Sequence, residues 1–587
     1  MPVKNQPKDF FLWPPPKFVE RTRGVQRIPK TGPKICSVIN KGMDPEAYEL
    51  EITTRFSSIV AGNARGIEHA QRTFDQLRKQ CGDVVPCLRV VDAPDFAVRG
   101  FMLDISRGKV PTNEALRVLV RQLASLKFNH LQLYTEHTFA FRKHKKAWRD
   151  ADPLTAKDIS ALQSLCAENH IELSANFNSF GHFERWLKHP EYQHLAECPR
   201  GFTHPIKGKM PHGTTLRPND ASLKFLNKLW AEYLPLFKSK RFNVGGDEPW
   251  ELGQGWSKPL VKKLGKHRVY LNFVKKLHRL AAKHGKQMLF WGDILLESPE
   301  LAAEVPADAT ALLWGYEANH PFAEQCARLA AAKKKFWVCP GTSAWNTFTG
   351  RSDNMLANLE SAAKHGLAHD AEGLLLTSWG DGGNHQPWPV MYPGIAYAAG
   401  LAWNQKGARR KDVARAVNLA FSQTMNSGYG EILLELGRVE NTLKHLKPNR
   451  SRHYNIFFAT RAELKKELAD LSRPELLAVL NALAKVRKKL SERGEKYLWE
   501  YGSLNELETG TDMAAWAIQR ALADKGGDAS PKRPRTARRA VPTLKPQEFR
   551  GILPDLIEQF MNAWANRARE GGLRESALRM AKIGRDL

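Results

Sequence analysis

Residues 241–250 read RFNVGGDEPW and join a short apolar strand to two adjacent carboxylates. Phe242 and Val244 fit a buried strand, and the glycine pair after them permits backbone conformations that other residues avoid. Asp247 and Glu248 then lie at the carboxyl end of that strand. Neighbouring acids beside apolar residues are costly to desolvate, so the pair indicates either a functional site or a solvated strand end.

Short apolar runs of this kind recur along the chain, and a helical stretch follows each of them. The runs begin at Phe101, His130, Ile171, Phe242, Met288, Ala311, Phe336 and Leu374. The predicted helices between them span residues 113–126, 156–169, 221–237, 269–284, 321–333 and 353–365. This alternation predicts parallel strands joined by crossover helices. Eight repeats over about 300 residues fit a (β/α)8 TIM barrel of the α/β class better than an open doubly wound sheet.

We place this barrel at residues 97–405, after a smaller unit at residues 1–96. The first part of that unit, residues 1–33, is rich in proline and basic residues and is expected to be an irregular lead-in. The rest reads as a small α+β domain, with an amphipathic helix at 66–80 and strands at 47–54, 56–60 and 88–91.

Residues 406–587 form a predicted α-helical C-terminal region. Its apolar stripes are marked by Leu476, Leu480, Leu483, Leu490, Met513, Trp516, Leu522, Leu556, Phe560 and Trp564. A basic linker with several glycines and prolines interrupts the region near residues 525–545. We expect these helices to cover the barrel or to mediate self-association.

The net charge is +28, from 89 Lys and Arg against 61 Asp and Glu. The basic residues are spread along helical segments and the linker, without a recognised nucleic-acid motif. Such a distribution is typical of a solvated surface, so we do not expect nucleic acid to be a partner.

Cysteine spacing and hydropathy bear on the compartment. The seven cysteines are scattered without a CxxC pair, the N-terminus lacks an apolar signal segment, and no stretch is long enough to span a bilayer. We therefore expect a cytoplasmic protein with no disulfide framework and no membrane association. The histidines lack HExxH spacing and Gly-rich phosphate loops are absent, so we expect neither a metal nor another cofactor.

The residues after the predicted strands share one chemistry. In a (β/α)8 barrel these strand ends form the active-site face. An indole stacks on the apolar face of a pyranose, and carboxylates accept hydrogen bonds from hydroxyls. Together they predict a sugar site from Arg99, Asp104, Glu136, His137, residues 176–182, Asp247, Glu248, Trp291, Asp293, Trp314, Glu317, Trp345, Trp379 and Asp381.

In order along the chain, these motifs resemble those of family 20 glycoside hydrolases, the β-N-acetylhexosaminidases. The motifs are RGFMLDISR at 99–107, FGH at 180–182, NVGGDE at 243–248, WGD at 291–293, Trp314 and WGD at 379–381. The resemblance extends to the small α+β domain and covers roughly residues 35–405. It implies hydrolysis of glycans that end in an N-acetylhexosamine.

The resemblance also implies how the adjacent acids divide their work. Neighbouring residues at a strand end point in different directions, so Asp247 and Glu248 do not simply flank a glycosidic bond. In this family the 2-acetamido oxygen of the substrate attacks the anomeric carbon and gives an oxazolinium intermediate. By resemblance, Glu248 is the general acid and later the base, whereas Asp247 orients the acetamido group.

Further roles carry over from the family. Arg99 resembles the arginine that binds the ring hydroxyls, although a buried ion pair with Asp104 is the alternative. Asp381 resembles the acid that accepts from the distal hydroxyls, and His182 resembles either a histidine coupled to the general acid or a structural one. The pocket lining is expected from Trp291, Trp314, Trp345 and Trp379.

Two features depart from the family pattern. Glu136-His137 follows the second strand, where relatives carry an Asp pair, so the residues that support the acid differ. The loop at 341–350 contains no tyrosine to donate to the acetamido oxygen, so the donor is expected to be Asn346, Tyr316 or another residue that the sequence does not identify.

Three functions therefore remain open from the sequence. The leading one is an exo-acting β-N-acetylhexosaminidase that removes terminal β-linked GlcNAc or GalNAc. The alternatives are a catalytically silent glycan-binding protein on the same barrel and a polyanion-binding protein that uses the basic helical tail.

Overall fold

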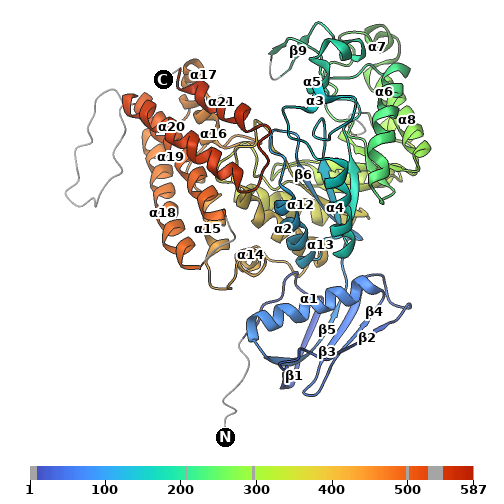
Figure 1. Cartoon of the computed structure of the whole chain (residues 1–587), viewed down its shortest axis with the longest axis vertical. Coiled ribbons are helices and arrows are strands. Elements are labelled where there is room, and N and C mark those ends of the chain that lie inside the picture. The colour runs from blue at the N-terminus through green and yellow to red at the C-terminus, as the bar shows by residue number, and fades with distance from the viewer. Residues whose placement is uncertain are drawn as a thin grey trace, which may run out of the picture.

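The structure is a computed structural model that describes residues 9–205, 208–293, 296, 298–497, 502–525 and 546–585. Figure 1 shows three parts: an α+β unit near the N-terminus, a central barrel, and a set of C-terminal helices that lies against one side of the barrel. The predicted linker falls at residues 526–545, outside the described residues.

Eight parallel strands close the central barrel in chain order. They are β6 (Val98–Asp104), β7 (His130–Tyr134), β8 (Glu172–Asn176), β11 (Arg241–Asn243), β12 (Gln287–Trp291), β13 (Thr310–Trp314), β14 (Lys335–Cys339) and β15 (Gly373–Ser378). Most strand residues are buried because helices cover the outside of the barrel and side chains fill its inside. The predicted barrel is confirmed.

Helices connect the strands close to the predicted ranges. They are α2 (Asn113–Ser125), α4 (Ala156–Glu168), α6 (Asp220–Tyr233), α8 (Lys266–Lys283), α11 (Phe322–Ala331), α12 (Ser352–Ala368) and α13 (Tyr392–Trp403). Three of them begin where Thr112, Thr155 and Asn219 accept a hydrogen bond from a first-turn backbone N–H. Every residue of α13 is buried, which matches its almost entirely apolar sequence.

The N-terminal unit is a five-stranded sheet with one helix on it. The sheet order is β1 (Phe18–Arg27), β5 (Val84–Asp92), β3 (Tyr48–Ile52), β4 (Ser57–Ala61), β2 (Ile35–Ile39), and α1 (Ala64–Cys81) packs against the sheet. The expectation of an irregular lead-in is therefore wrong for Phe18–Arg27, which pairs antiparallel with β5. This strand holds its place through backbone pairing while most of its side chains are exposed, so it lacks the alternating apolar pattern that signals a strand.

Buried charges connect this unit to the barrel. Arg99 lies at the start of β6, is 1% exposed and pairs with Glu46 of the N-terminal unit. Its remaining N–H groups donate to the carbonyls of Lys127 (2.8 Å) and Phe96 (3.0 Å). Beside it, the Lys127 ammonium lies 3.1 Å from the Asp92 carboxylate. The barrel and the N-terminal unit therefore share a network of buried ions.

The C-terminal helices share the core of the barrel. They are α14 (Val413–Phe421), α15 (Tyr429–Leu436), α16 (Arg452–Phe458), α17 (Arg461–Leu468), α18 (Arg473–Tyr497), α19 (Ser503–Lys525), α20 (Pro546–Ala565) and α21 (Leu573–Ile583). All the predicted apolar stripe residues are buried, and one continuous hydrophobic cluster includes them together with barrel residues. These helices are thus packed onto the barrel as part of one folded body.

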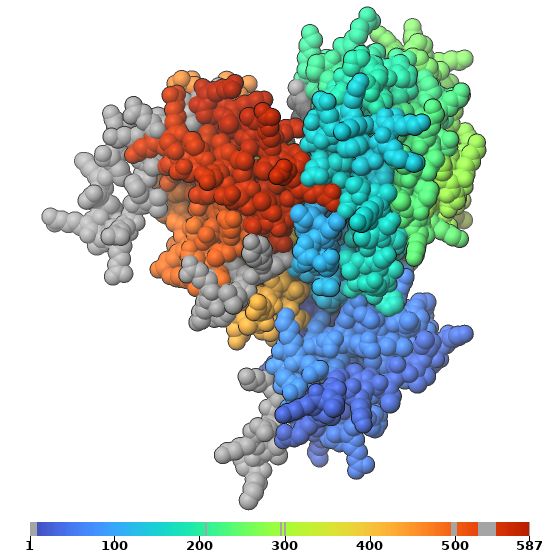
Figure 2. Space-filling view, viewed as in Figure 1, coloured from blue at the N-terminus to red at the C-terminus, as the bar shows by residue number. Residues whose placement is uncertain are grey.

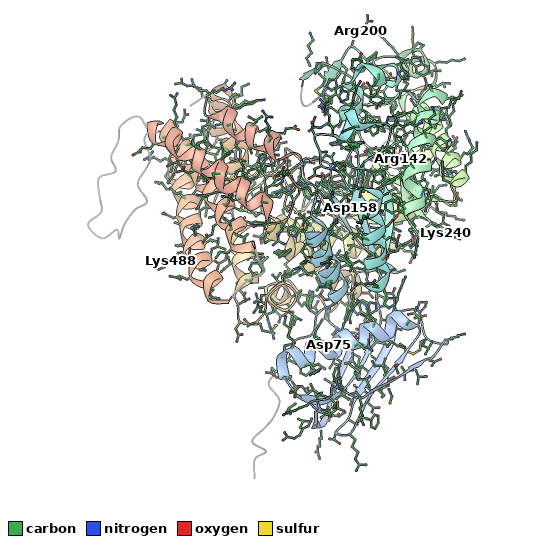
Figure 3. All side chains as sticks on the ribbon, viewed as in Figure 1. Asp75, Arg142, Asp158, Arg200, Lys240 and Lys488 are labelled. Atoms are coloured by element: carbon green, nitrogen blue, oxygen red, sulfur yellow. The ribbon has the colours of Figure 1, made fainter. Side chains whose placement is uncertain are left out.

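Charged side chains project from every part of the molecule (Figure 3). The labelled Asp75, Arg142, Arg200, Lys240 and Lys488 mark the N-terminal unit, the barrel and the C-terminal helices. Within the described ranges, no helix is both long and apolar enough to cross a membrane. All seven cysteines fall within these ranges, and none forms a disulfide.

The Arg99–Glu46 pair gives a stability prediction. Replacing Arg99 by Met leaves the Glu46 carboxylate buried without its main partner, so we expect a loss of about 3 kcal/mol of unfolding free energy in chemical denaturation. The matched control Arg89→Met breaks an exposed pair with Glu49 and should leave the unfolding free energy close to that of the wild type. Wild-type stability in Arg99→Met would contradict this role of the pair.

Candidate functional site

The carboxyl ends of the barrel strands gather an aromatic floor. Trp291 and Trp379 lie with ring centroids 5.8 Å apart, and Tyr134 meets Trp379 edge-on at 4.8 Å. On the other side, Trp314 stacks on Tyr316 at 5.4 Å. The Trp379 indole N–H donates to the Tyr316 hydroxyl at 2.8 Å. This cluster offers flat apolar faces of the kind that pack on a sugar ring.

Asp247 lies above this floor because the chain after β11 turns through two glycines. Gly245 and Gly246 have φ values of 72° and 94°. A side chain at Gly245 would start 2.4 Å from the Asn178 amide oxygen. Only glycine gives this turn without strain, and it lets Asn178 donate to Asp247 Oδ1 at 3.1 Å.

The second oxygen of Asp247 pairs with a histidine. His182 Nε2 lies 3.2 Å from Asp247 Oδ2. Burial alone would lower the pKa of His182, but the Asp247 charge and its hydrogen bond raise that pKa to about 9. Burial raises the pKa of Asp247. The charges of His182 and Arg107 and the hydrogen bond from Asn178 outweigh burial and hold this pKa below its usual value. Both partners are therefore ionised at neutral pH.

Glu248 points into open space beside this pair. Its side chain is 37% exposed, against 11% for Asp247, and its Oε2 lies 3.8 Å from His182 Nε2. Its φ is 48°, an uncommon value for a residue with a side chain. The backbone thus directs one carboxylate into the barrel and the next toward solvent.

Arg107 connects the first two strand ends to this pair. Its guanidinium lies 3.1 Å from Asp104 and 3.2 Å from Glu136, and it packs 5.2 Å over the Trp379 ring. Asp104 also accepts the backbone N–H of residue 380 at 2.9 Å. Arg107 is therefore fixed by two carboxylates next to the aromatic floor.

Two further carboxyls complete the charged set. Burial raises the pKa of Asp381, an effect that Arg107 opposes and that Asp104 and Glu248 reinforce. Burial, and then the charge of Asp247, raise the pKa of Asp293 to about 8. Both groups therefore hold a proton more readily than an exposed aspartate.

A wide cleft of about 690 Å³ opens above these residues. Its barrel side includes Arg107, Glu136, His182, Glu248, Trp250, Asn346 and Asp381, and its opposite side is formed by C-terminal residues that include Asn449, Arg450, Tyr454, Phe458 and Arg579. Figure 2 shows the C-terminal helices lying against the barrel loops. Across the described residues, no three His, Cys, Asp or Glu side chains are grouped as metal ligands.

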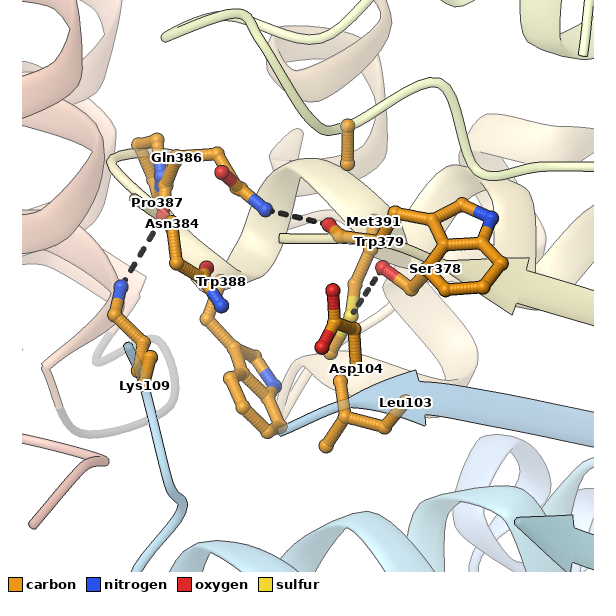
Figure 4. Close-up of a pocket in the computed structure, with 11 residues that line it drawn as sticks. Leu103, Asp104, Lys109, Ser378, Trp379, Asn384, Gln386, Pro387, Trp388 and Met391 are labelled. Atoms are coloured by element: carbon orange, nitrogen blue, oxygen red, sulfur yellow. Dashed lines mark hydrogen bonds between the residues drawn. The ribbon is translucent and has the colours of Figure 1, made fainter. Parts of the chain in front are cut away.

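A small pocket lies beside Trp379 and is lined by residues that include Lys109 and Gln386 (Figure 4). Its volume of about 20 Å³ is enough for roughly one water molecule. Gln386 donates to the Trp379 carbonyl at 2.8 Å, and Lys109 contacts the Gln386 carbonyl at 3.4 Å while lying 4.9 Å over Trp564 of α20. Burial lowers the pKa of Lys109 to about 8. The loop that carries Trp379 is thus supported from the C-terminal region.

The sequence of the barrel decides its family. Residues 96–373 match the model of the glycosyl hydrolase family 20 catalytic domain. The barrel is therefore similar to the family 20 catalytic domain over residues 96–373.

Relatives that match part of this chain agree with the family of its barrel. It is 27% identical over 220 residues to beta-hexosaminidase subunit A1 of Dictyostelium discoideum, which covers 35% of this chain and 40% of that protein. The beta-hexosaminidase of Porphyromonas gingivalis is 24% identical over 281 residues, covering 43% and 36%. The matches therefore span less than half the length of these two relatives.

Solved structures share the fold. A beta-N-acetylhexosaminidase crystal structure gives a TM-score of 0.58 at 18% identity, covering 70% of this chain and 95% of that one. The chitobiase of Flavobacterium johnsoniae gives the same score and identity, covering 96% and 98%.

The structure corrects the placement of Arg99. It lies at the amino end of β6, opposite the cleft, and pairs with Glu46, not with Asp104. The residue that reaches the cleft is Arg107, at the other end of the same RGFMLDISR motif. Its position three residues after the strand end was the available signal, because strand-end residues face the site.

His137 also lies apart from the site, whereas Glu136 reaches it. Glu136 accepts from the Tyr134 hydroxyl at 3.0 Å and meets Arg107. Burial, together with the charges of Arg185 and Lys188, lowers the pKa of His137 to about 3. It does not line the cleft.

The remaining predicted residues divide between floor and cleft. The floor holds Trp291, Trp314, Trp345, Trp379 and Tyr316, and the cleft holds His182, Asn346, Asp381 and Glu248. Asn178, which contacts Asp247, falls within the predicted range 176–182, whereas sequence reasoning missed Tyr134 and all the cleft residues after 405. For those after 405 no motif gives a signal.

The raised pKa of His182 predicts a pH-dependent stability. The pKa of His182 is about 9 in the folded protein, above the ordinary value of about 6.5. The protonated histidine therefore stabilises the folded state fully below about pH 6.5, and this stabilisation is lost as the pH rises through about 9. The Tm difference between wild type and His182→Asn should therefore be large in mild acid and shrink toward about pH 9. The exposed His445→Asn serves as the control, and a difference that grows with pH would contradict the ion pair.

Proposed function

We propose that this protein is an exo-acting β-N-acetylhexosaminidase that uses the acetamido group of its substrate as the nucleophile. The main support is that two adjacent acids have different surroundings. Asp247 is held as a buried anion, whereas Glu248 lines the cleft. The relatives that match the barrel are themselves named beta-hexosaminidases.

The proposed first step transfers one proton and breaks one glycosidic bond. Glu248 donates its proton to the leaving oxygen while the acetamido carbonyl oxygen attacks the anomeric carbon. Asp247 accepts the acetamido N–H, whose positive charge grows as the oxazolinium ring forms. An anion already fixed by Asn178 and His182 needs no reorganisation to stabilise that charge.

The second step reverses the proton transfer. Glu248, now a carboxylate, takes a proton from water, and the water oxygen attacks the anomeric carbon and opens the oxazolinium ring. The acetamido oxygen attacks the anomeric carbon from one face, and the water later attacks it from the other. The product therefore keeps the β configuration.

Tyr316 is the donor we propose for the acetamido oxygen. Its hydroxyl oxygen already accepts the Trp379 indole N–H at 2.8 Å, which leaves its own O–H available to donate. It belongs to the aromatic cluster with Trp314, whereas Asn346 lies in the outer cleft with its amide directed to the Asn449 carbonyl at 3.4 Å. This geometry favours Tyr316 over Asn346.

Arg107 and Asp381 are proposed to bind the ring hydroxyls of the terminal sugar. A guanidinium presents two parallel N–H groups to adjacent oxygens, and Arg107 already lies over Trp379. The buried indoles below it leave little room for a further sugar, which supports the removal of a terminal residue.

Hydrolysis of a chromogenic β-N-acetylglucosaminide tests the proposed activity, with the β-N-acetylgalactosaminide alongside. Glu248→Gln removes the proton donor and should lower kcat by about 10²- to 10⁴-fold, whereas Glu324→Gln on the exposed face of α11 should leave kcat unchanged.

Full activity of Glu248→Gln would reject its role. A folded wild type that binds GlcNAc in calorimetry and hydrolyses neither glycoside would favour the silent glycan-binding alternative.

A further inference from the structure

The C-terminal helices form one wall of the cleft, and that wall is tied to the site. The Trp345 indole donates to the Asn449 side chain at 2.8 Å. The Tyr454 hydroxyl of α16 donates to the Gly382 carbonyl at 3.1 Å, next to Asp381. The Ser576 hydroxyl of α21 donates to the carbonyl of residue 383 at 2.7 Å. The wall is therefore positioned by the same loops that carry the floor.

Two arginines on this wall have no carboxylate partner among the residues that the structure describes. Arg450 is exposed, and its guanidinium lies 3.5 Å from the Asn455 side-chain oxygen. Arg579 donates to the Gly382 carbonyl and lies 5.4 Å over the Phe458 ring. Tyr454 lines the same cleft. Burial raises the pKa of its phenol, and the positive charges of Arg579 and Arg450 oppose that rise.

The acidic residues on the wall are already engaged. Glu467 pairs with Arg452 at 3.3 Å, and Glu575 pairs with Arg185 of the barrel at 2.7 Å. Glu463 accepts from Thr460 at 2.8 Å as part of the capping box that begins α17. Arginines therefore compensate Glu467 and Glu575, and Glu463 is held at the start of α17. Arg450 and Arg579, by contrast, present positive charge toward the barrel side that carries Glu248.

We propose that this wall is a leaving-group subsite for a sugar that carries an anionic oxygen substituent. The inference rests on the proposed function, because the sugar that departs from Glu248 occupies the cleft between the barrel and the wall. Arginine forks bind carboxylate, sulfate or phosphate oxygens in pairs, and the Phe458 ring gives the sugar an apolar face to pack on.

The test compares leaving groups with and without an anionic substituent on the departing sugar. One pair is GlcNAc β-1,4-linked to N-acetylmuramic acid and the same disaccharide with its carboxylate converted to the methylamide. A second pair is GlcNAc linked to GlcNAc with and without a 6-sulfate, which distinguishes carboxylate from sulfate. We expect kcat/KM to favour at least one anionic member by roughly ten- to a hundredfold, the effect of charge-assisted hydrogen bonds.

The double variant Arg450→Gln/Arg579→Gln should bring that ratio close to one. Arg574→Gln is a control for the Arg579 substitution, because it removes one positive charge from α21 at an exposed position that does not line the cleft. Unfolding midpoints for both variants show whether the fold is retained. A wild-type ratio near one for both pairs, with hydrolysis intact, would overturn the subsite and leave the proposed function standing.

Binding of the free leaving sugars tests the subsite without turnover. Calorimetry should give tighter binding of N-acetylmuramic acid or GlcNAc 6-sulfate than of the matching neutral sugar, and the double variant should abolish the difference. If hydrolysis itself is absent, the proposed function fails. Equal affinities in the wild type would overturn the anionic subsite in either case.

Discussion

The ion pair between Asp247 and His182 is the interaction on which the rest of the site depends. An aspartate buried above an aromatic floor would take up a proton unless opposite charge compensated its desolvation. His182 provides that charge, and Arg107 with Asn178 adds to it. Glu136, which follows β7, lies close to both His182 and Arg107 and balances their positive charge. The arrangement keeps one carboxylate charged and fixed while Glu248, one residue later, remains in the cleft, where we propose that it transfers the proton.

The C-terminal helices change how this barrel meets its substrate. They share its hydrophobic core, support the loop of Trp379 through Lys109, and hold Trp345 through Asn449. A barrel of this kind usually forms its site from its own strand-end loops. Here a region more than 40 residues beyond the last strand supplies part of the cleft, which is why we propose that its charges select the leaving group.

The fold was predictable because each strand and crossover helix carries a local apolar period, and eight such repeats allow few architectures. The acids and tryptophans were predictable because strand ends converge by topology. Arg99 was misplaced because a motif names several residues on one strand without saying which end reaches the cleft. Phe18–Arg27 was missed because an edge strand held by backbone pairing needs no apolar alternation. The wall residues were beyond reach because tertiary packing alone brings residues after 405 to the site.

The most direct measurement of the central claim is the rate of hydrolysis for aryl β-glucosaminides whose N-acetyl group carries zero, one, two or three fluorines. Fluorine withdraws electrons from the acetamido oxygen, so an attack by that oxygen must slow as fluorine is added. The account predicts that kcat/KM falls steeply and monotonically along the series. Rates that stay level along the series would contradict it and would point to a nucleophile supplied by the enzyme.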